Sequence, residues 1–270
     1  MSDIARTAGI AIIAAIALCT GPLLDAAYAV PIPVTQSSAS LEPCWGCSWI
    51  NDQGSRNASV SGTGPRGGRG GASASPGTVR AHAHASPLAA PPAIGDNVHA
   101  TGQRIGRYVF NGVDPGGPID VSVSYSTSAL LGLTTASAYS LTFRTYVRAH
   151  TPVGALSLFG GEVSRSDNPI WDITTGFTSG DISFNPNAPL ALIVSRSDTV
   201  SFQTTFAAGF AIEFVLEAIA NLQGGVDASN TGLFSVMVTT PGVTAALVPE
   251  PTAALLLLPA LGLLAIRRGA

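Results

Sequence analysis

Lysine is absent from this chain of 270 residues, and charged residues of all kinds make up only 11% of it. The formal net charge is −3 and the sequence isoelectric point is near 5.7. A protein that binds nucleic acid needs a concentrated basic surface, which this composition does not supply. The sequence therefore predicts that nucleic acid is not a partner.

Cysteine and histidine are also scarce, with three and four copies, and this limits catalytic chemistry. His99 and His150 fall in the region expected to fold, and neither lies in a motif that pairs a base with a nucleophile. Glu213 and Glu217 could share one side of a strand or helix as acid and base, but a solvent-facing side explains them more simply. The sequence predicts no enzyme, no catalytic residue and no cofactor.

The candidate metal ligands lack the spacing of a known site. His82 and His84 alternate with alanine and have no third ligand, so a solvated segment is expected. Four further residues carry side-chain oxygens without the order of a Ca²⁺ loop, and turn chemistry explains them: Asp167, Asn168, Asp172 and Asp181. No metal site is predicted.

The N-terminus has the layout of a secretory signal peptide over residues 1–29. An apolar stretch from Ala8 to Leu18 follows a charged start, and Pro22 precedes the small residues Ala27 and Ala29. A signal peptidase binds an extended segment with small side chains at two such positions. The alternative, an uncleaved anchor, needs a longer apolar run. Export by the secretion machinery, with cleavage after Ala29, is therefore predicted.

The C-terminal segment, residues 248–270, combines a rigid entry, an apolar run and a cationic end. These parts are Pro249-Glu250-Pro251, the stretch from Ala253 to Ile266, and Arg267-Arg268. A helix over the apolar stretch would be about 21 Å long, short of the hydrocarbon thickness of about 30 Å. The arginines would stay on the cytoplasmic side, which leaves the rest of the chain outside. A short transmembrane helix that holds the protein transiently in the inner membrane is predicted.

This order of features resembles the PEP-CTERM sorting signal of Gram-negative bacteria, over about the last two dozen residues. The resemblance implies an exosortase, a membrane transpeptidase-like enzyme, as a partner, and an association with exopolysaccharide and biofilm production. It implies that Pro249, Glu250 and Pro251 are recognised and that Arg267 and Arg268 form the retention signal. A plain membrane anchor is the alternative, although it would not need the Pro-Glu-Pro entry. The expected destination is the cell surface or the extracellular medium.

Cys44 and Cys47 enclose Trp45 and Gly46, which is the spacing of a redox motif. A redox-active pair is one interpretation, but no strand is expected before it and no helix after it. An exported protein enters an oxidising compartment in which disulfides persist. A local structural disulfide between Cys44 and Cys47 is therefore expected.

Residues 30–97 show little periodicity and include a glycine- and arginine-rich stretch at residues 62–71. Such a segment buries too little apolar surface to offset the entropy lost on ordering. A disordered linker rich in glycine, serine, proline and arginine is predicted.

From residue 98 to residue 247, apolar and polar residues alternate with period two, which indicates half-buried strands. The alternating apolar sets are Ile119, Val121, Val123 and Tyr125; Tyr139, Leu141, Phe143 and Val147; Val200, Phe202 and Phe206; Phe210, Ile212, Phe214 and Leu216; and Phe234, Val236 and Val238. About eight to ten strands of this spacing predict an all-β fold, an antiparallel β-sandwich of the jelly-roll kind. Residues 211–222 have a helical alternative.

Three classes of function follow from these features. The first is an exported surface or matrix protein, structural or associated with exopolysaccharide. The second is a carbohydrate-binding module, in which Tyr146 and Trp171 would stack on sugar rings. The third is a secreted hydrolase that uses carboxylates. The first class is the prediction, with signal peptidase, an exosortase and exopolysaccharide as partners.

Overall fold

The computed structural model describes residues 32–86, 96–132, 139–166, 172–185, 188–229 and 232–248. In these ranges the chain forms β-strands and one short 3-10 helix, η2 (Ser179–Asp181). None of the helical structure in the described ranges is long and apolar enough to cross a membrane. The predicted signal peptide and C-terminal helix lie outside the described residues, and so do Ala27, Ala29, Pro249, Glu250, Pro251, Arg267 and Arg268.

The first sheet, sheet A, contains eight of the described strands, and seven of them lie side by side. Their order is β10 (Ile173–Thr175), β9 (Gly154–Ser166), β8 (Ser140–Thr151), β13 (Phe210–Leu222), β6 (Asp96–Gly112), β1 (Gln36–Glu42) and β2 (Ile50–Gly54). The eighth strand, β16 (Val243–Leu247), pairs with the far end of β6. All of these pairings are antiparallel.

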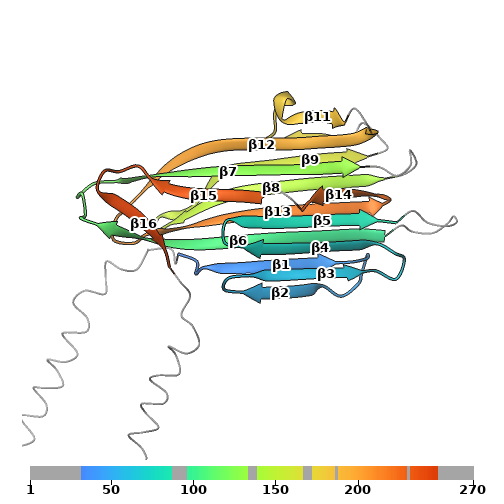
Figure 1. Ribbon diagram of the computed structural model, residues 1–270, viewed down its shortest axis with the longest axis horizontal. Helices are drawn as coiled ribbons and strands as arrows, with labels where there is room; N and C mark the ends of the chain where they lie inside the picture. The colour runs from blue at the N-terminus through green and yellow to red at the C-terminus, as the bar shows by residue number, and fades with distance from the viewer. Residues whose placement is uncertain are drawn as a thin grey trace, which may run out of the picture.

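The second sheet, sheet B, also contains eight described strands in antiparallel pairing. Their order is β11 (Ile182–Asn185), β12 (Ala188–Thr204), β7 (Ile119–Gly132), β14 (Gly224–Ala228), β5 (Thr78–Ala85), β4 (Arg69–Ser75) and β3 (Ala58–Thr63). All seven residues of β15 (Gly232–Val238) pair with β7. The two sheets form a sandwich whose strands follow its long axis (Figure 1). The predicted antiparallel β-sandwich is confirmed.

The period-two interpretation holds along the predicted strands. In β7 the apolar set that begins with Ile119 is buried, while the serines between its members face outward. β13 pairs with β6 on one side and with β8 on the other, so the helical alternative for residues 211–222 is wrong. The physical reason is the period of two: every second side chain from residue 210 to residue 216 reaches the core, and a helix would point them to different sides. These side chains are Phe210, Ile212, Phe214 and Leu216.

The predicted disordered linker at residues 30–97 is wrong, because residues 36–85 form β1 to β5 and supply strands to both sheets. Small residues are what this region contributes to the core. Ala81, Ala83 and Ala85 of β5 are buried, and they alternate with outward-facing residues. A Cβ at Gly102 of β6 would lie 2.6 Å from the Arg80 carbonyl oxygen of the opposite sheet, so the sheets meet there closely. The composition of residues 30–97 suggested low complexity, but the alternating alanines are small enough to let the two sheets pack closely.

The two ends of the described chain lie together at one end of the sandwich. Thr35 donates a hydrogen bond from its hydroxyl to the Val248 carbonyl oxygen at 3.0 Å. The Val248 N–H donates to the Arg107 carbonyl oxygen at 2.8 Å. β1 runs away from this end, so the turn that joins β1 to β2 lies at the opposite end, as Figure 1 shows.

Candidate functional site

The outward side of sheet A carries the densest polar network among the described residues, and we call it the polar face. Alternation explains why these residues point outward, because their neighbours along each strand fill the core. Glu213 is only 8% exposed and Val215 only 3%, so neighbouring side chains cover this part of the face. The polar face consists of Ser38, Ser40 and Glu42 of β1; His99, Thr101 and Gln103 of β6; Glu213, Val215 and Glu217 of β13; Thr142, Arg144, Tyr146, Arg148 and His150 of β8; and Glu162 and Ser164 of β9.

Arg144 joins two carboxylates across three strands. The pairing places Glu162 of β9 and Glu217 of β13 on either side of it. Its Nε donates to Glu162 Oε2 at 2.9 Å, and its Nη1 lies 3.6 Å from Glu217 Oε2. The hydrogen bond from Arg144 holds the pKa of Glu162 below its ordinary value, and the same bond raises the pKa of Arg144. Both groups therefore stay charged near neutral pH.

Tyr146 lies in the next row of β8 and binds the second oxygen of Glu217. Its hydroxyl donates to Glu217 Oε1 at 3.0 Å, and the Arg148 guanidinium carbon lies 4.7 Å from the centre of its ring. Burial, followed by the negative charge of Glu217, raises the pKa of Tyr146 to about 12. The phenol is therefore a neutral hydrogen-bond donor rather than a base.

Glu213 has three partners at the other end of the face. Gln103 donates from Nε2 to Glu213 Oε1 at 2.7 Å, and His150 Nε2 lies 3.0 Å from Glu213 Oε2. Arg148 Nη1 lies 3.8 Å from the same oxygen. The Ser38 hydroxyl in turn donates to Gln103 Oε1 at 2.9 Å, which fixes the amide orientation. The expectation that Glu213 and Glu217 face plain solvent is wrong, because cross-strand partners surround both carboxylates.

This arrangement suits recognition better than acid–base catalysis. A carboxylic acid that gives up a proton near neutral pH needs a raised pKa, usually through an apolar site. Here each of the three carboxylates contacts an arginine, and the pKa of Glu162 is shifted downward. The network instead presents fixed donors and acceptors on a rigid sheet. Among the described residues, no group of three or more His, Cys, Asp or Glu side chains has the arrangement of a metal site.

The turn between β1 and β2 lies where the polar face ends. Cys44 and Cys47 are joined by a disulfide across this turn. Trp49 packs edge-on against His99, with ring centres 5.1 Å apart, so the polar face extends to this indole. Trp45, inside the disulfide loop, is 77% exposed. The sequence analysis did not predict a role for either tryptophan. The signal that could have found them is their position, since Trp45 lies between the two cysteines and Trp49 lies just after the second.

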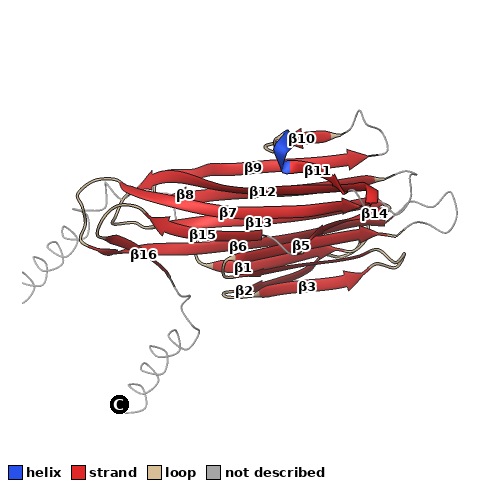
Figure 2. Cartoon of the chain, turned by 45° about the horizontal axis from the view of Figure 1, so that its top comes forward, coloured by secondary structure: helices blue, strands red, loops and turns tan. Residues whose placement is uncertain are grey.

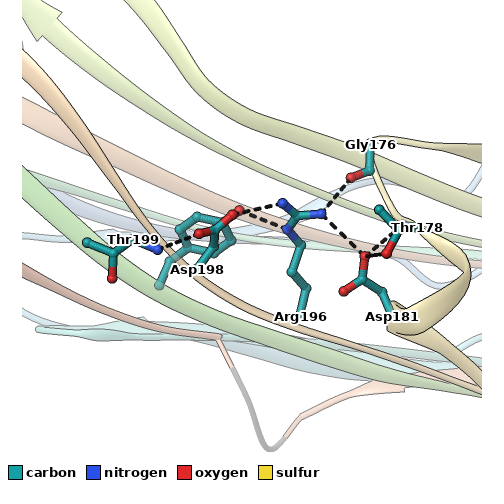
Figure 3. Close-up of polar contacts among 7 residues, drawn as sticks. Gly176, Thr178, Asp181, Arg196, Asp198 and Thr199 are labelled. Carbon is teal, nitrogen blue, oxygen red and sulfur yellow. Dashed lines mark hydrogen bonds and ion pairs between the residues drawn. The ribbon is translucent and has the colours of Figure 1, made fainter.

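A second polar cluster closes one side edge of the sandwich, between β9 and β12. Arg196 lies with its guanidinium 4.9 Å from the centre of the Phe159 ring and donates to Asp198 Oδ2 at 2.8 Å. It also reaches Asp181 Oδ2 at 3.3 Å and the Gly176 carbonyl oxygen at 3.2 Å, as Figure 3 shows. Because this cluster ties the segment that crosses between the sheets to β12, we assign it to stability. Figure 2 shows the crossing segment with β10 and β11 along this edge.

His82 and His84 lie on the outward side of sheet B, beside a hollow of about 850 Å³. Glycines line part of it, among them Gly70 and Gly225, and a Cβ at Gly225 would lie 3.2 Å from the His84 ring. Burial, and then the charge of Arg69, lowers the pKa of His84. The prediction of a solvated linker is wrong for these histidines, since both belong to β5.

The structure also locates the other candidate calcium ligands and sugar-stacking residues that lie within its described ranges. The Ser166 N–H donates to Asp172 Oδ1 at 2.8 Å, which is turn chemistry, and Asp181 belongs to the Arg196 cluster. Tyr146 lies on the polar face with its hydroxyl bound to Glu217. Asp167, Asn168 and Trp171 lie outside the described residues.

Comparison with known proteins gives few matches. No protein-family model and no curated protein matches the chain. Among solved structures, the family 11 xylanase from Neocallimastix patriciarum is 14% identical, with a TM-score of 0.23 over 68% of this chain and 91% of the xylanase. A loop-swap mutant of Xyn11A from this organism is also 14% identical, with a TM-score of 0.22 over 67% and 95%. At these TM-scores the likeness carries no argument about function.

Proposed function

We propose that this protein is an exported envelope protein that adheres to exopolysaccharide through the polar face of sheet A. The observation that carries the proposal is the polar face itself, in which side chains of five adjacent strands are fixed by their own hydrogen bonds. Polysaccharides present many hydroxyl groups at regular spacing, and a rigid field of amide, hydroxyl, carboxylate and guanidinium groups complements them. Because these side chains are already ordered before the ligand binds, they lose less conformational entropy on binding.

The delivery part of the proposal rests on the two terminal segments. A signal peptidase would cleave after Ala29, and an exosortase would act at Pro249, Glu250 and Pro251 while the protein is held in the inner membrane. The disulfide between Cys44 and Cys47 supports export, because such bonds persist in oxidising compartments. Intact-mass analysis of protein from the medium tests this part. Mature protein is expected to lack Arg267 and Arg268 in the native host, and to retain both in a strain without the exosortase.

Binding is tested by co-sedimentation of the full chain with exopolysaccharide purified from the producing strain. Arg148 lies at the rim of the polar face and is 46% exposed in its side chain. Arg148→Gln is expected to weaken binding at least about tenfold, since a hydrogen bond to a charged group is worth about 1.5–3 kcal/mol. Arg80→Gln, on the exposed outward side of β5, is the matched control and is expected to bind like the wild type. Equal binding by wild type and Arg148→Gln would contradict the assignment of this face.

A further inference from the structure

The turn that joins β1 to β2 is held rigid by three independent contacts. The disulfide between Cys44 and Cys47 closes it, and the Cys47 N–H donates to the Cys44 carbonyl oxygen at 3.0 Å. Gly46 has a φ of +73°, a backbone conformation that residues other than glycine rarely adopt. Its N–H donates to Glu42 Oε1 at 3.1 Å. A turn fixed in this way loses little entropy when a ligand binds to it.

This rigid turn presents apolar surface rather than hiding it. Trp45 is the most exposed aromatic residue in the described ranges, and Trp49 is 44% exposed. A folded chain gains by burying an indole, so two indoles left exposed on and beside a locked turn need another explanation. Trp49 is also positioned, since its ring meets His99 edge-on. Burial lowers the pKa of His99, whose Nε2 lies 3.2 Å from the Thr101 hydroxyl.

Polar groups surround these indoles on the same end of sheet A. Ser40 pairs with Asn51, and Ser38 pairs with Gln53, so hydroxyl and amide side chains continue the polar face toward the turn. Of the two charged residues between positions 42 and 54, Glu42 faces the outward side, whereas Asp52 lies on the other side of β2 and accepts from the Ser59 N–H at 2.8 Å. An acidic polymer would meet the like charge of Glu42 here, whereas an uncharged one would not.

We infer that Trp45 and Trp49 form a sugar-stacking subsite that binds an uncharged polysaccharide at the end of the polar face. This inference rests on the proposed function and names its ligand class. The apolar C–H face of a pyranose ring would lie against an indole, and Asn51, Gln53 and Ser40 would bond the ring hydroxyls. The subsite lies at the end of the sandwich opposite to Thr35 and Val248, so a protein attached through its C-terminal segment would present it outward.

The test measures binding of the full chain, kept in mild detergent, by affinity electrophoresis in gels that contain one polysaccharide each. The probes are the neutral polymers dextran, laminarin, galactomannan and hydroxyethyl cellulose, with alginate as an acidic polymer. At least one neutral polymer is expected to retard the wild type, and alginate is not. Trp45→Ala and Trp49→Ala are each expected to weaken the retardation at least tenfold, and Trp45→Phe less. Phe184→Ala removes an aromatic side chain that is 65% exposed on sheet B and is the matched control.

Each outcome separates this inference from the proposed function. If neutral polymers retard Trp45→Ala and Trp49→Ala as they retard the wild type, while Arg148→Gln weakens retardation, the subsite is wrong and the polar face stands. If neither the polymers nor the producer's exopolysaccharide bind, both proposals fail. Stronger retardation by alginate would overturn the assignment to uncharged ligands. Binding to phosphatidylcholine vesicles that depends on Trp45, without binding to any polymer, would assign the turn to a membrane surface instead. Thermal unfolding of each variant checks that lost binding is not lost folding.

Discussion

The outward sides of the two sheets are built from the same alternation but carry different chemistry. On sheet B, hydroxyls of β7 and β12 pair directly, as Ser122 does with Ser201 at 2.8 Å and Ser124 with Thr199 at 2.9 Å. On sheet A, charged and amide groups replace them and bind across several strands. A hydroxyl in such a pair can rotate and act as donor or acceptor, so the pair does not fix its orientation. The network of sheet A holds each group in one orientation. This difference is the reason that we propose sheet A, rather than sheet B, as the recognition surface.

The largest difference between the two faces is expected in stability. Glu213→Ala removes the acceptor of Gln103 and the partner of His150, and leaves these groups without their contacts in a covered site. The cost is expected to be about 1–3 kcal/mol in the free energy of unfolding. Urea denaturation measures it. Glu213→Gln, which keeps the shape and one oxygen, is the matched variant and should lose less; equal loss would mean that charge alone matters.

Removal of the disulfide between Cys44 and Cys47 is expected to have the next largest effect, which falls on sugar binding more than on stability. The loop closed by Cys44 and Cys47 is very short, so chain entropy limits the disulfide's contribution to at most about 2 kcal/mol. Cys44→Ser with Cys47→Ser is expected to leave the unfolding of the sandwich nearly unchanged and to weaken sugar binding through a looser Trp45. Mass spectrometry of exported protein is expected to find the pair oxidised. Rapid thiol turnover by this pair would instead favour the redox interpretation.

The pairing of Glu162 with Arg144 gives sheet A a pH dependence. The pKa of Glu162 is lower in the folded protein than its ordinary value of 4.5, so the unfolded chain binds this proton more tightly. The stability from this pair is therefore fully present above pH 4.5 and is lost as the pH falls through the lower folded value. Thermal unfolding between pH 7 and pH 3 measures it. Glu162→Gln is expected to flatten the acid limb, and an unchanged acid limb would show that the pair contributes nothing.

The strand pattern of residues 98–247 could be predicted because period two is a local property of the sequence. It placed Glu213 and Glu217 on one side of a segment, but not next to Arg144, Tyr146 and Gln103, because cross-strand register depends on which strands become neighbours. β13 lies between β6 and β8, and each of them is far from it in sequence. β1 to β5 were missed for another reason. Their apolar surface comes from alanines opposite glycines, as at Ala83 beside Gly70, and such pairs look like low complexity until a second sheet packs against them.

The smallest effect on stability is expected from changes to the outward serines of sheet B, and these variants test directly which sheet binds the polymer. Ser122, Ser124 and Ser126 each share an outward hydroxyl pair with β12. Water replaces an exposed hydroxyl partner readily, so each serine to alanine change is expected to alter the free energy of unfolding by less than about 0.5 kcal/mol. The triple variant is also expected to bind exopolysaccharide like the wild type, while the single change Arg148→Gln on sheet A weakens binding. Co-sedimentation of both variants on the same polymer preparation decides between the faces. If the triple variant binds more weakly than Arg148→Gln, the hydroxyl rows of sheet B are the adhesive surface, and the network of sheet A serves to hold the sandwich together.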